Sequence, residues 1–310
     1  MSDKEAVITV RGLVKTYKKL NAVDGIDLDI IRGEIFAFLG PNGAGKTTTV
    51  EIIEGIRTPT SGSVEMLGHD PQKGSDKLKS RMGVLPQEFT SFDKLTVKET
   101  MDFYKSLYKS TVKVDDIIRM LDLEDHRKKL YQNLSGGLKQ RVGIAASLVN
   151  DPEIVFLDEP TTGLDPQARH DVWEVIRRLK RGGKTIFLTT HYMEEAQELA
   201  DHVAIINHGR IIAEGTVEGL IEKYGQGTVL EFIGPHPYLV PMMREAGLST
   251  SHCTAEKICL LMDNSNDLLG ILELIRGAGL DYRGINVRRS NLEEVFLTLT
   301  GEQLSEEVKK

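Results

Sequence analysis

The sequence has no apolar run that could cross a bilayer, few cysteines and no long stripe of basic residues. Its apolar stretches, such as EIFAFLG (34–40) and EIVFLDEP (153–160), are much shorter than the about 20 residues that a transmembrane helix needs. The first ten residues place no apolar segment behind a basic one, so we expect no secretory signal. We therefore expect a cytoplasmic protein, and any membrane step in its work would need another chain.

The cysteine content and the charge exclude further classes. Cys253 and Cys259 have neither the CxxC spacing nor a second pair, so we interpret them as small thiols in a reducing compartment. A net charge of −7 argues against a nucleic-acid-binding surface. Hydrophobic residues make up 40% of the 310 positions, which is enough for a sizeable core and predicts a large domain with a smaller one.

The order of predicted elements indicates an α/β fold with a parallel sheet. Residues 1–39 are typical of strands, and residues 96–150 form a mainly helical block. Strands and helices then alternate up to a polar break at 222–228. Beyond the break, the order βαββαβ predicts a small ferredoxin-like domain, in which Pro241 early in the first helix is unfavourable. A final helix, NLEEVFLTLTG, precedes a charged tail.

GPNGAGKT (40–47) matches the phosphate-binding loop G-x-x-x-x-G-K-[ST], and it follows an apolar strand and opens a helix. Glycines at 43 and 45 let backbone N–H groups turn toward a β-phosphate, and the helix N-terminus adds partial positive charge. Lys46 is expected to reach the β- and γ-phosphates, and the Thr47 hydroxyl suits Mg²⁺. A chance Gly-rich turn would not need both flanking elements, so we predict a nucleotide site.

Two further strands end in polar residues. EIVFLDEP delivers Asp158, a candidate Mg²⁺ ligand, and Glu159, which could take a proton from an attacking water. An acidic pair of this kind is more often a capping or loop feature, but the phosphate loop favours the functional interpretation. KTIFLTTH (184–191) ends in His191, which is either a structural histidine or a group near the γ-phosphate, and the geometry favours the second.

Three features remain open from the residues alone. Gln87 after MGVLP is undecided between a turn residue and a site residue. Tyr17 could stack on an adenine ring or only pack. Ser135 in LSGGLKQR (134–141) suits the N-cap of a helix, and the following glycines leave its first N–H groups uncovered for an anion. Taken in isolation, this stretch favours a capped helix with no further role.

Together these motifs resemble the ATP-binding subunit of an ABC transporter, over roughly residues 5–220. GPNGAGKTT resembles Walker A, LSGGLKQR the ABC signature, IVFLDEP Walker B and GLDP (163–166) the D-loop. The resemblance implies a P-loop NTPase of the ABC type at 1–224, with a helical subdomain at about 88–150 and an accessory domain at 225–310. The ligands that it implies are ATP and Mg²⁺.

The resemblance also implies roles for individual residues. Glu159, His191 and Gln87 would act in hydrolysis, and Thr47, Gln87 and Asp158 would hold Mg²⁺. The ATP-binding residues would be Tyr17, Gly40, Pro41, Asn42, Gly43, Ala44, Gly45, Lys46, Thr47, Thr48, Ser135, Gly136, Gly137 and Asp165. In this family two copies meet head to tail, so that Ser135 and Gly137 would contact the ATP of the partner and Asp165 would communicate across the interface.

The signature departs from the common LSGGQ at Leu138. An apolar residue there resembles the ABC-2 export branch, as does the ending NLEEVFLTLTG. The resemblance implies a homodimer that works with a separate transmembrane permease, peripheral on the inner face of the cell membrane. No nucleic acid is expected as a partner.

Two alternatives have a different function. A soluble ABC ATPase that acts on DNA or ribosomes would usually carry a coiled-coil insertion or two ATPase domains, and this chain shows one set of motifs and no heptad run. An ATP-sensing regulator could dispense with Lys46, Asp158, Glu159 and His191, all of which are intact. We therefore expect an ATPase that drives export.

Overall fold

A computed structural model gives the structure of the chain, and it describes residues 5–74, 76–225, 227–233, 241, 250–253, 257–262, 267–277, 279 and 283–300. The chain divides into two compact units, Met1–Thr216 and Val217–Lys310. The boundary that we propose lies at residue 224. It differs from this division by one helix, α8 (Val217–Tyr224).

The first unit is built on a mostly parallel sheet with the strand order β5-β6-β7-β3-β8-β9. Neighbours from β5 to β8 are parallel, and β8 and β9 form an antiparallel hairpin. Every residue of β3, β6 and β7 is buried, as expected for strands covered on both faces. The strands are β3 (Ile35–Leu39), β5 (Met82–Leu85), β6 (Ile154–Asp158), β7 (Thr185–Thr190), β8 (His202–Asn207) and β9 (Arg210–Gly215).

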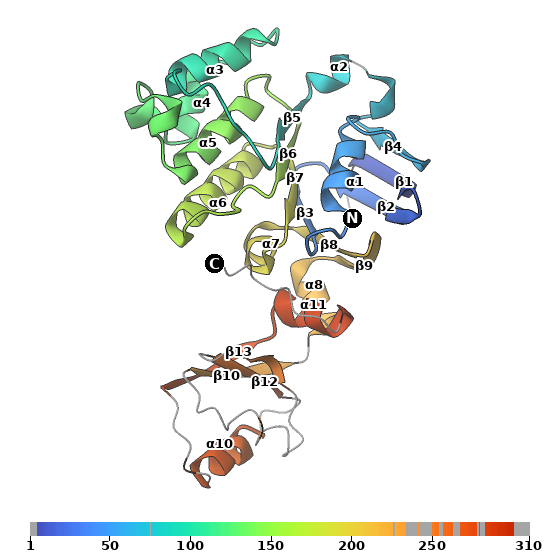
Figure 1. The fold of residues 1–310 in the computed structure, drawn as a ribbon, viewed down its shortest axis with the longest axis vertical. Helices are drawn as coiled ribbons and strands as arrows, with labels where there is room; N and C mark the ends of the chain where they lie inside the picture. The colour runs from blue at the N-terminus through green and yellow to red at the C-terminus, as the bar shows by residue number, and fades with distance from the viewer. Residues whose placement is uncertain are drawn as a thin grey trace. The chain divides into compact units, whose positions relative to one another are not determined.

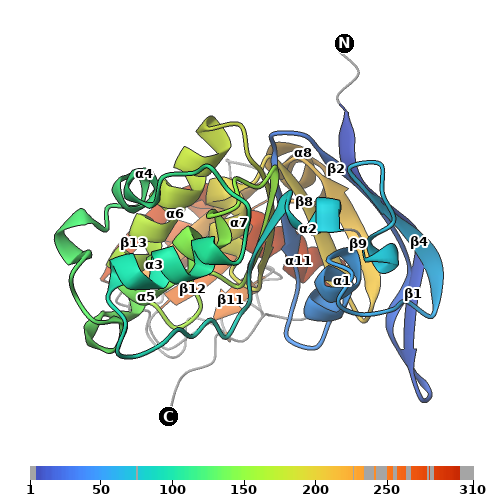
Figure 2. The same cartoon turned by 90° about the horizontal axis from the view of Figure 1, so that it is seen from above.

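A second, antiparallel sheet in the order β2-β1-β4 covers one side of this sheet, together with α1 (Figure 2). The alternation of apolar and polar residues in β2 matches its burial pattern, with valine, isoleucine and leucine inward and aspartates outward. Its inner face shares a core with β3 and with α1, which carries the phosphate loop. The elements are β1 (Ala6–Tyr17), β2 (Leu20–Ile31), β4 (Ser61–Met66) and α1 (Lys46–Ile53).

Helices cover the other side of the parallel sheet (Figures 1 and 2). They share one core, in which Trp173 is the largest fully buried side chain. These helices are α3 (Val97–Ser106), α4 (Val114–Met120), α5 (Gly136–Ser147), α6 (Pro166–Arg181) and α7 (Met193–Leu199), whereas α2 (Asp76–Lys79) packs into the core that contains α1. Short 3₁₀ turns lie at Pro71–Lys73, Glu124–His126 and Tyr131–Asn133.

The second unit has an antiparallel sheet in the order β11-β12-β10-β13. This order and these strand directions are those of the predicted split βαβ arrangement. Of its first helix, expected at 238–247, only residue 241 is described, and it is helical. The elements after α8 are β10 (Thr228–Ile233), β11 (Thr250–Cys253), β12 (Lys257–Met262), α10 (Asp267–Gly277), β13 (Gly284–Arg289) and α11 (Leu292–Thr300).

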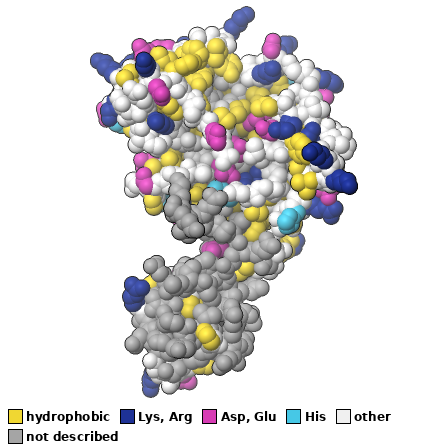
Figure 3. Space-filling model, viewed as in Figure 1, with side chains coloured by type: hydrophobic (Ala, Val, Ile, Leu, Met, Phe, Trp, Pro, Cys, Tyr) yellow, Lys and Arg dark blue, Asp and Glu magenta, His cyan; other side chains and the backbone are white. Residues whose placement is uncertain are grey.

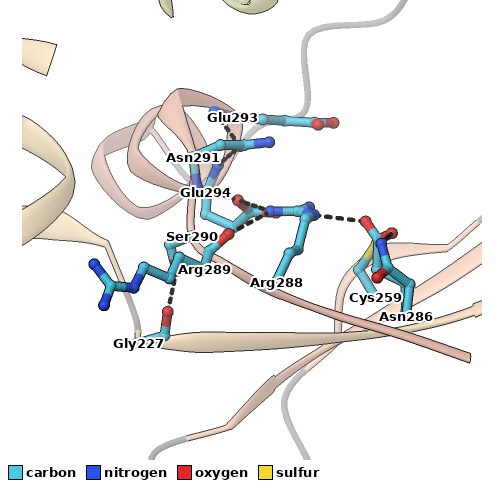
Figure 4. Close-up of polar contacts among 10 residues, drawn as sticks. Gly227, Cys259, Asn286, Arg288, Arg289, Ser290, Asn291, Glu293 and Glu294 are labelled. Carbon is cyan, nitrogen blue, oxygen red and sulfur yellow. Dashed lines mark hydrogen bonds and ion pairs between the residues drawn. The ribbon is translucent and has the colours of Figure 1, made fainter. Parts of the chain in front are cut away.

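A buried charge network joins the sheet of the second unit to α11 (Figure 4). Arg288 on β13 donates to Glu231 on β10 at 2.6 Å and binds both oxygens of Glu294 at 2.9 and 2.7 Å. Both carboxylates are at least 95% buried. Because Glu294 also accepts from the backbone N–H of Asn291 at 2.8 Å, the network holds the first turn of α11 on the sheet.

Candidate active site

Four neighbouring strands of the parallel sheet end at the same edge, and a predicted site residue follows each one. β3 leads into the phosphate loop, β5 to Gln87, β6 to Glu159 and β7 to His191. The carboxyl ends of parallel strands are where ligands bind in open α/β sheets. The fold therefore brings together groups that are more than 100 residues apart in the sequence.

The phosphate loop, Gly40–Thr48, turns from β3 into α1 in the way that the motif predicts. Gly45 is the N-cap of α1, has a φ of 109° and makes no side-chain cap, so the first N–H groups of the helix are not covered by a capping side chain. A Cβ atom at Gly45 would lie 2.3 Å from the carbonyl oxygen of Ala22, which excludes larger residues. Asn42, Gly43 and Thr47 are exposed; Pro41, Gly45 and Thr48 are half-buried; Gly40, Ala44 and Lys46 are buried.

Lys46 projects from the first turn of α1 into the cluster, and only 4% of its side chain is exposed. Its Nζ donates to the carbonyl oxygens of Gly40 at 2.8 Å and Pro41 at 3.2 Å. The same atom lies 3.2 Å from Oε1 of Glu159. Burial lowers the pKa of Lys46, and the carboxylates of Glu159 and Asp158 oppose this shift.

Glu159 is the centre of the cluster. Oε1 pairs with Lys46, and Oε2 accepts hydrogen bonds from Gln87 Nε2 at 3.2 Å and Thr162 Oγ1 at 3.1 Å. His191 Nδ1 lies 3.1 Å from Oε2. Burial acts to raise the pKa of Glu159, but His191 and Lys46 outweigh it and lower this pKa to about 2. The carboxylate is therefore ionised at neutral pH.

The backbone of Glu159 is strained. Its φ of 48° lies in the left-handed region, which costs a non-glycine residue about 1 kcal/mol or more. Two hydrogen bonds from its N–H to Thr189, at 3.1 Å to the carbonyl and 3.0 Å to the hydroxyl, hold this conformation. Strain of this kind persists where the surroundings fix it, and here it turns the carboxylate toward Lys46.

Asp158, at the end of β6, accepts a hydrogen bond from the hydroxyl of Thr189 on β7. Burial raises its pKa, and the adjacent Glu159 adds to this effect. A nearby divalent cation would favour the ionised form. The described residues contain no group of three or more His, Cys, Asp or Glu side chains placed to bind a metal by themselves. Mg²⁺ on a nucleotide needs fewer protein ligands, because waters and phosphate oxygens supply the rest, so Asp158 and Thr47 fit it.

The signature residues lie apart from this cluster. Ser135 is the N-cap of α5, and its Oγ accepts weakly from the N–H of Leu138 at 3.4 Å. α5 and α1 are on opposite sides of the sheet in both views (Figures 1 and 2). In the part of the chain that the structure describes, no hydrogen bond or ion pair joins Ser135 to the phosphate loop. One copy of the chain therefore does not bring its signature onto its own phosphate loop.

Asp165 is the N-cap of α6, where its side chain accepts from the N–H of Ala168 at 2.9 Å. Gly137 packs directly on this helix, since a Cβ atom there would lie 2.8 Å from Cβ of Ala168. A structural role for Gly137 and a cap role for Ser135 are thus present, as the simpler interpretation of LSGGLKQR expects. Ser135 and Gly136 are exposed, so they are also accessible to a second molecule.

Tyr17 ends β1 with 38% of its surface exposed. Lys15 Nζ lies 5.3 Å and the Arg57 guanidinium 5.6 Å from the centre of its ring. The ring can thus make cation–π contacts, and its exposure leaves it accessible to a planar ligand. Among the described residues, the contacts of Tyr17 are with Lys15 and Arg57, and none joins it to Lys46 or Glu159.

Two residues of the site were not found from the sequence. Thr162 donates to Glu159, and Thr189 contacts both Asp158 and the backbone of Glu159. Threonine is a favoured strand residue, so Thr189 in KTIFLTTH carried no distinct signal. Its position directly opposite Asp158 across two parallel strands depends on their register.

A groove of about 470 Å³ lies along the edge strand β5, between β5 and the helical block. Its walls include Phe89, Tyr104 and Tyr108, and Glu54 reaches it from the end of α1. Apolar side chains also gather on the surface near α3 (Figure 3), where Phe92, Phe103 and Leu107 are exposed. Exposed aromatic residues of this number on one face are typical of a protein-binding surface.

Comparison with known proteins gives the family. The family model described as ABC transporter matches residues 23–162. The daunorubicin resistance ATP-binding protein DrrA3 of Streptomyces coeruleorubidus is 36% identical over 306 residues, which cover 96% of this chain and 97% of that protein. The Nod factor export ATP-binding protein I of Burkholderia pseudomallei (strain 1710b) is 38% identical and covers 96% and 98%. The chain belongs to the ATP-binding subunits of ABC transporters.

Solved structures agree with this assignment. A structure titled as the ATP-binding subunit of an ABC transporter superposes with a TM-score of 0.63 at 28% identity, over 70% of this chain and 93% of that one. The dimeric structure of MJ0796, a bacterial ABC transporter cassette, gives 0.60 at 27%, over 67% and 98%. The predicted family and fold class are confirmed. The protein is thus an ATPase of the export branch, and the comparisons favour transport over the DNA, ribosome and regulator alternatives.

Proposed function

We propose that two copies of this chain close head to tail around ATP, and that hydrolysis at Glu159 releases them to drive a separate membrane permease. The observation that carries this proposal is the separation of two anion-binding features within one chain. The phosphate loop lies with Lys46 and Glu159, whereas exposed Ser135 is the N-cap of α5, a helix on the other side of the sheet in Figure 2. In a pair of copies, the phosphate loop of one chain could face the signature segment of the other, and the reverse. The dimeric cassette structure among the similar proteins supports this.

In this proposal the chain binds ATP through residues 40–48, with Lys46 on the β- and γ-phosphates and Tyr17 on the adenine. Thr47, Asp158 and Gln87 would hold Mg²⁺, which neutralises phosphate charge when it is bound. A γ-phosphate competes with Glu159 for the ammonium of Lys46, so ATP binding would free the carboxylate to orient and deprotonate a water. His191 would contact the γ-phosphate from the next strand. Asp165, Ser135, Gly136 and Gly137 would act at the partner's site.

We further propose that the permease docks in the groove beside Gln87. The groove is lined by Phe89, Tyr104 and Tyr108, and the exposed Phe92 and Phe103 extend its apolar surface. Gln87 is two residues from Phe89 and contacts Glu159, so a partner in the groove is close to the proposed base. None of the helices described is long and apolar enough to cross a membrane. This docking would place the protein on the inner face of the cell membrane.

The cargo belongs to the permease in this proposal. Relatives with 36% and 38% identity are named for daunorubicin resistance and for Nod factor export, which are chemically unlike. Similar ATPases are thus named for different exported compounds.

The test is the mass of Glu159→Gln by light scattering, with and without ATP. We expect ATP to double the mass, because binding is retained and the base is lost. Adding Ser135→Arg should abolish the doubling, since it places a bulky charged side chain at the proposed interface. Gln132→Arg is the matched control, because it adds the same charge at an exposed position three residues earlier. A protein that binds ATP and stays monomeric would contradict the proposal.

A further inference from the structure

A buried carboxylate, Glu195, lies outside the cluster described above. It is on α7 and only 1% exposed. One of its oxygens, Oε1, accepts hydrogen bonds from Thr161 Oγ1 at 2.8 Å and Trp173 Nε1 at 3.0 Å. Both donors are themselves buried, with exposures of 0% and 1%. Burying an ionisable group is unfavourable unless its partners are fixed, so a purely apolar residue would pack between α6 and α7 with less desolvation.

The three residues belong to segments that begin at site residues. Thr161 is two residues after Glu159, in the loop that runs to the N-cap of α6. Trp173 lies on α6 itself, and Glu195 follows His191 by four residues. A single oxygen atom therefore ties the loop after the proposed base to the helix that follows the histidine. In Figure 1, α6 and α7 lie on the same side of the sheet.

Other contacts between α6 and α7 do not reach this loop. Arg169 lies over the ring of Tyr192, 4.5 Å from its centre, and Arg177 binds Glu198 at 3.0 Å. Positions 169, 173 and 177 are spaced by four, so they share one face of α6. The two arginine contacts hold the helices together. Between them lies the hydrogen bond from Trp173 to Glu195, and only Glu195 also binds Thr161.

We propose that Glu195 is a positioning residue for ATP hydrolysis, which holds the loop after Glu159 and the turn that carries His191 in one fixed arrangement. This rests on the roles of Glu159 and His191 in the proposed function. The two residues must approach the same phosphate from neighbouring strands, and Glu159 already has a strained backbone that depends on its surroundings. Glu195 holds this loop through its hydrogen bond from Thr161.

The role needs an acceptor oxygen and no negative charge. Burial raises the pKa of Glu195, while the hydrogen bonds from Thr161 and Trp173 oppose that shift. A glutamine keeps an acceptor oxygen of similar reach, whereas leucine leaves two buried donors without a partner. Glu195→Gln and Glu195→Leu therefore separate the acceptor from the size of the side chain.

The decisive comparison uses the two donors. Thr161→Val and Trp173→Phe each remove one hydrogen bond to the same oxygen, but only the first releases the loop. We expect Thr161→Val to lower kcat about 5- to 10-fold with KM for ATP within about 2-fold, and Trp173→Phe to leave kcat within about 2-fold. Glu195→Leu should lower kcat by about 10-fold or more, and Glu195→Gln should restore it. Glu198→Ala, which loses an exposed contact between the same helices, is the control.

Steady-state ATPase assays on the full chain give these values, and unfolding midpoints show whether each variant is folded. Equal losses of kcat for Thr161→Val and Trp173→Phe would overturn the proposal, because Glu195 would then only hold two helices together. Unchanged kcat in Glu195→Leu would overturn it as well. Glu159→Gln is assayed in parallel: if it keeps full turnover, the assigned base is wrong and the proposed function fails first. If Glu159→Gln is inactive and Thr161→Val is fully active, the positioning role alone is wrong.

Discussion

Both carboxylate oxygens of Glu159 have polar neighbours, and apart from Thr162 these come from distant parts of the sequence. Lys46 comes from α1, Gln87 from the end of β5, and His191 from the end of β7. The arrangement holds the pKa of the carboxyl near 2, so the group stays ionised over the whole working range of pH. At the scale of single residues, the site is thus a set of side chains that keep one buried carboxylate charged and fixed.

The pKa of Glu54, which lines the groove, is shifted in the opposite direction to that of Glu159. Burial, with Asp158 and Glu51 nearby, raises its pKa from an ordinary value of 4.5 to about 8. In the unfolded chain it ionises above 4.5, and in the folded chain it stays neutral up to about 8. Its contribution to stability is therefore complete below pH 4.5 and is lost progressively as the pH rises through 8.

We therefore expect Glu54→Gln to stabilise the protein at alkaline pH by about 1–3 kcal/mol, with a smaller difference at about pH 5.5. Urea unfolding of both proteins at about pH 5.5 and 8.5 measures this. Glu88→Gln removes an exposed carboxylate on the same groove and controls for net charge. The same gain at both pH values would show that burial of the Glu54 charge is not the cause.

At the scale of elements, the signature helix α5 depends on close contact with α6. Gly137 faces Ala168 without room for a side chain. A Cβ atom at Gly136 would meet only the flexible end of Leu164, at 3.4 Å. The two adjacent glycines of LSGGLKQR thus differ in what they do for the fold.

Gly137→Ala should lower the free energy of unfolding by about 1–3 kcal/mol, because the helices must separate. Gly136→Ala should change it by about 0.5 kcal/mol or less, as its neighbour can move. Thermal unfolding of the two variants without nucleotide gives the comparison. Similar losses in both would mean that α5 and α6 do not pack through Gly137.

The elements also show what the sequence could predict. Strand ends and helix starts follow from local patterns, so the phosphate loop, Asp158, Glu159 and His191 could be proposed as site residues from the sequence, and their roles stay predictions. Gln87 could not be decided from its position, because its contact with Glu159 spans 72 residues and depends on β5 lying beside β6. The partner that Lys46 has here, Glu159, was not predicted either, since the motif specifies phosphate contacts and not contacts between site residues.

At the scale of the whole molecule, the two units have separate cores. The first contains the only tryptophan of the chain, Trp173, in its helical core, and the second has a core of six buried aliphatic and aromatic residues among those described. Molecules of this kind need not unfold in one step. The fluorescence of Trp173 therefore follows the first unit, and circular dichroism follows both.

Arg288→Ala should destabilise the second unit by about 3 kcal/mol, because it leaves Glu231 and Glu294 buried without their shared cation. We expect the urea transition by circular dichroism to gain an earlier phase, while the transition of Trp173 fluorescence and the affinity for ATP stay unchanged. Arg289→Ala, at the exposed neighbouring position, should have no such effect. A shift of the fluorescence transition would show that the two units unfold together.

The contact between Lys46 and Glu159 has a consequence for how the chain controls ATP hydrolysis. Lys46 Nζ, which we propose binds the phosphate, lies 3.2 Å from Oε1 of Glu159, the proposed base. If the phosphate of ATP binds the Lys46 ammonium, as we propose, then Glu159 loses this partner only when ATP is present. Lys46 would then couple two steps: it pairs with the base while ATP is absent, and it releases the base when it binds the phosphate of ATP.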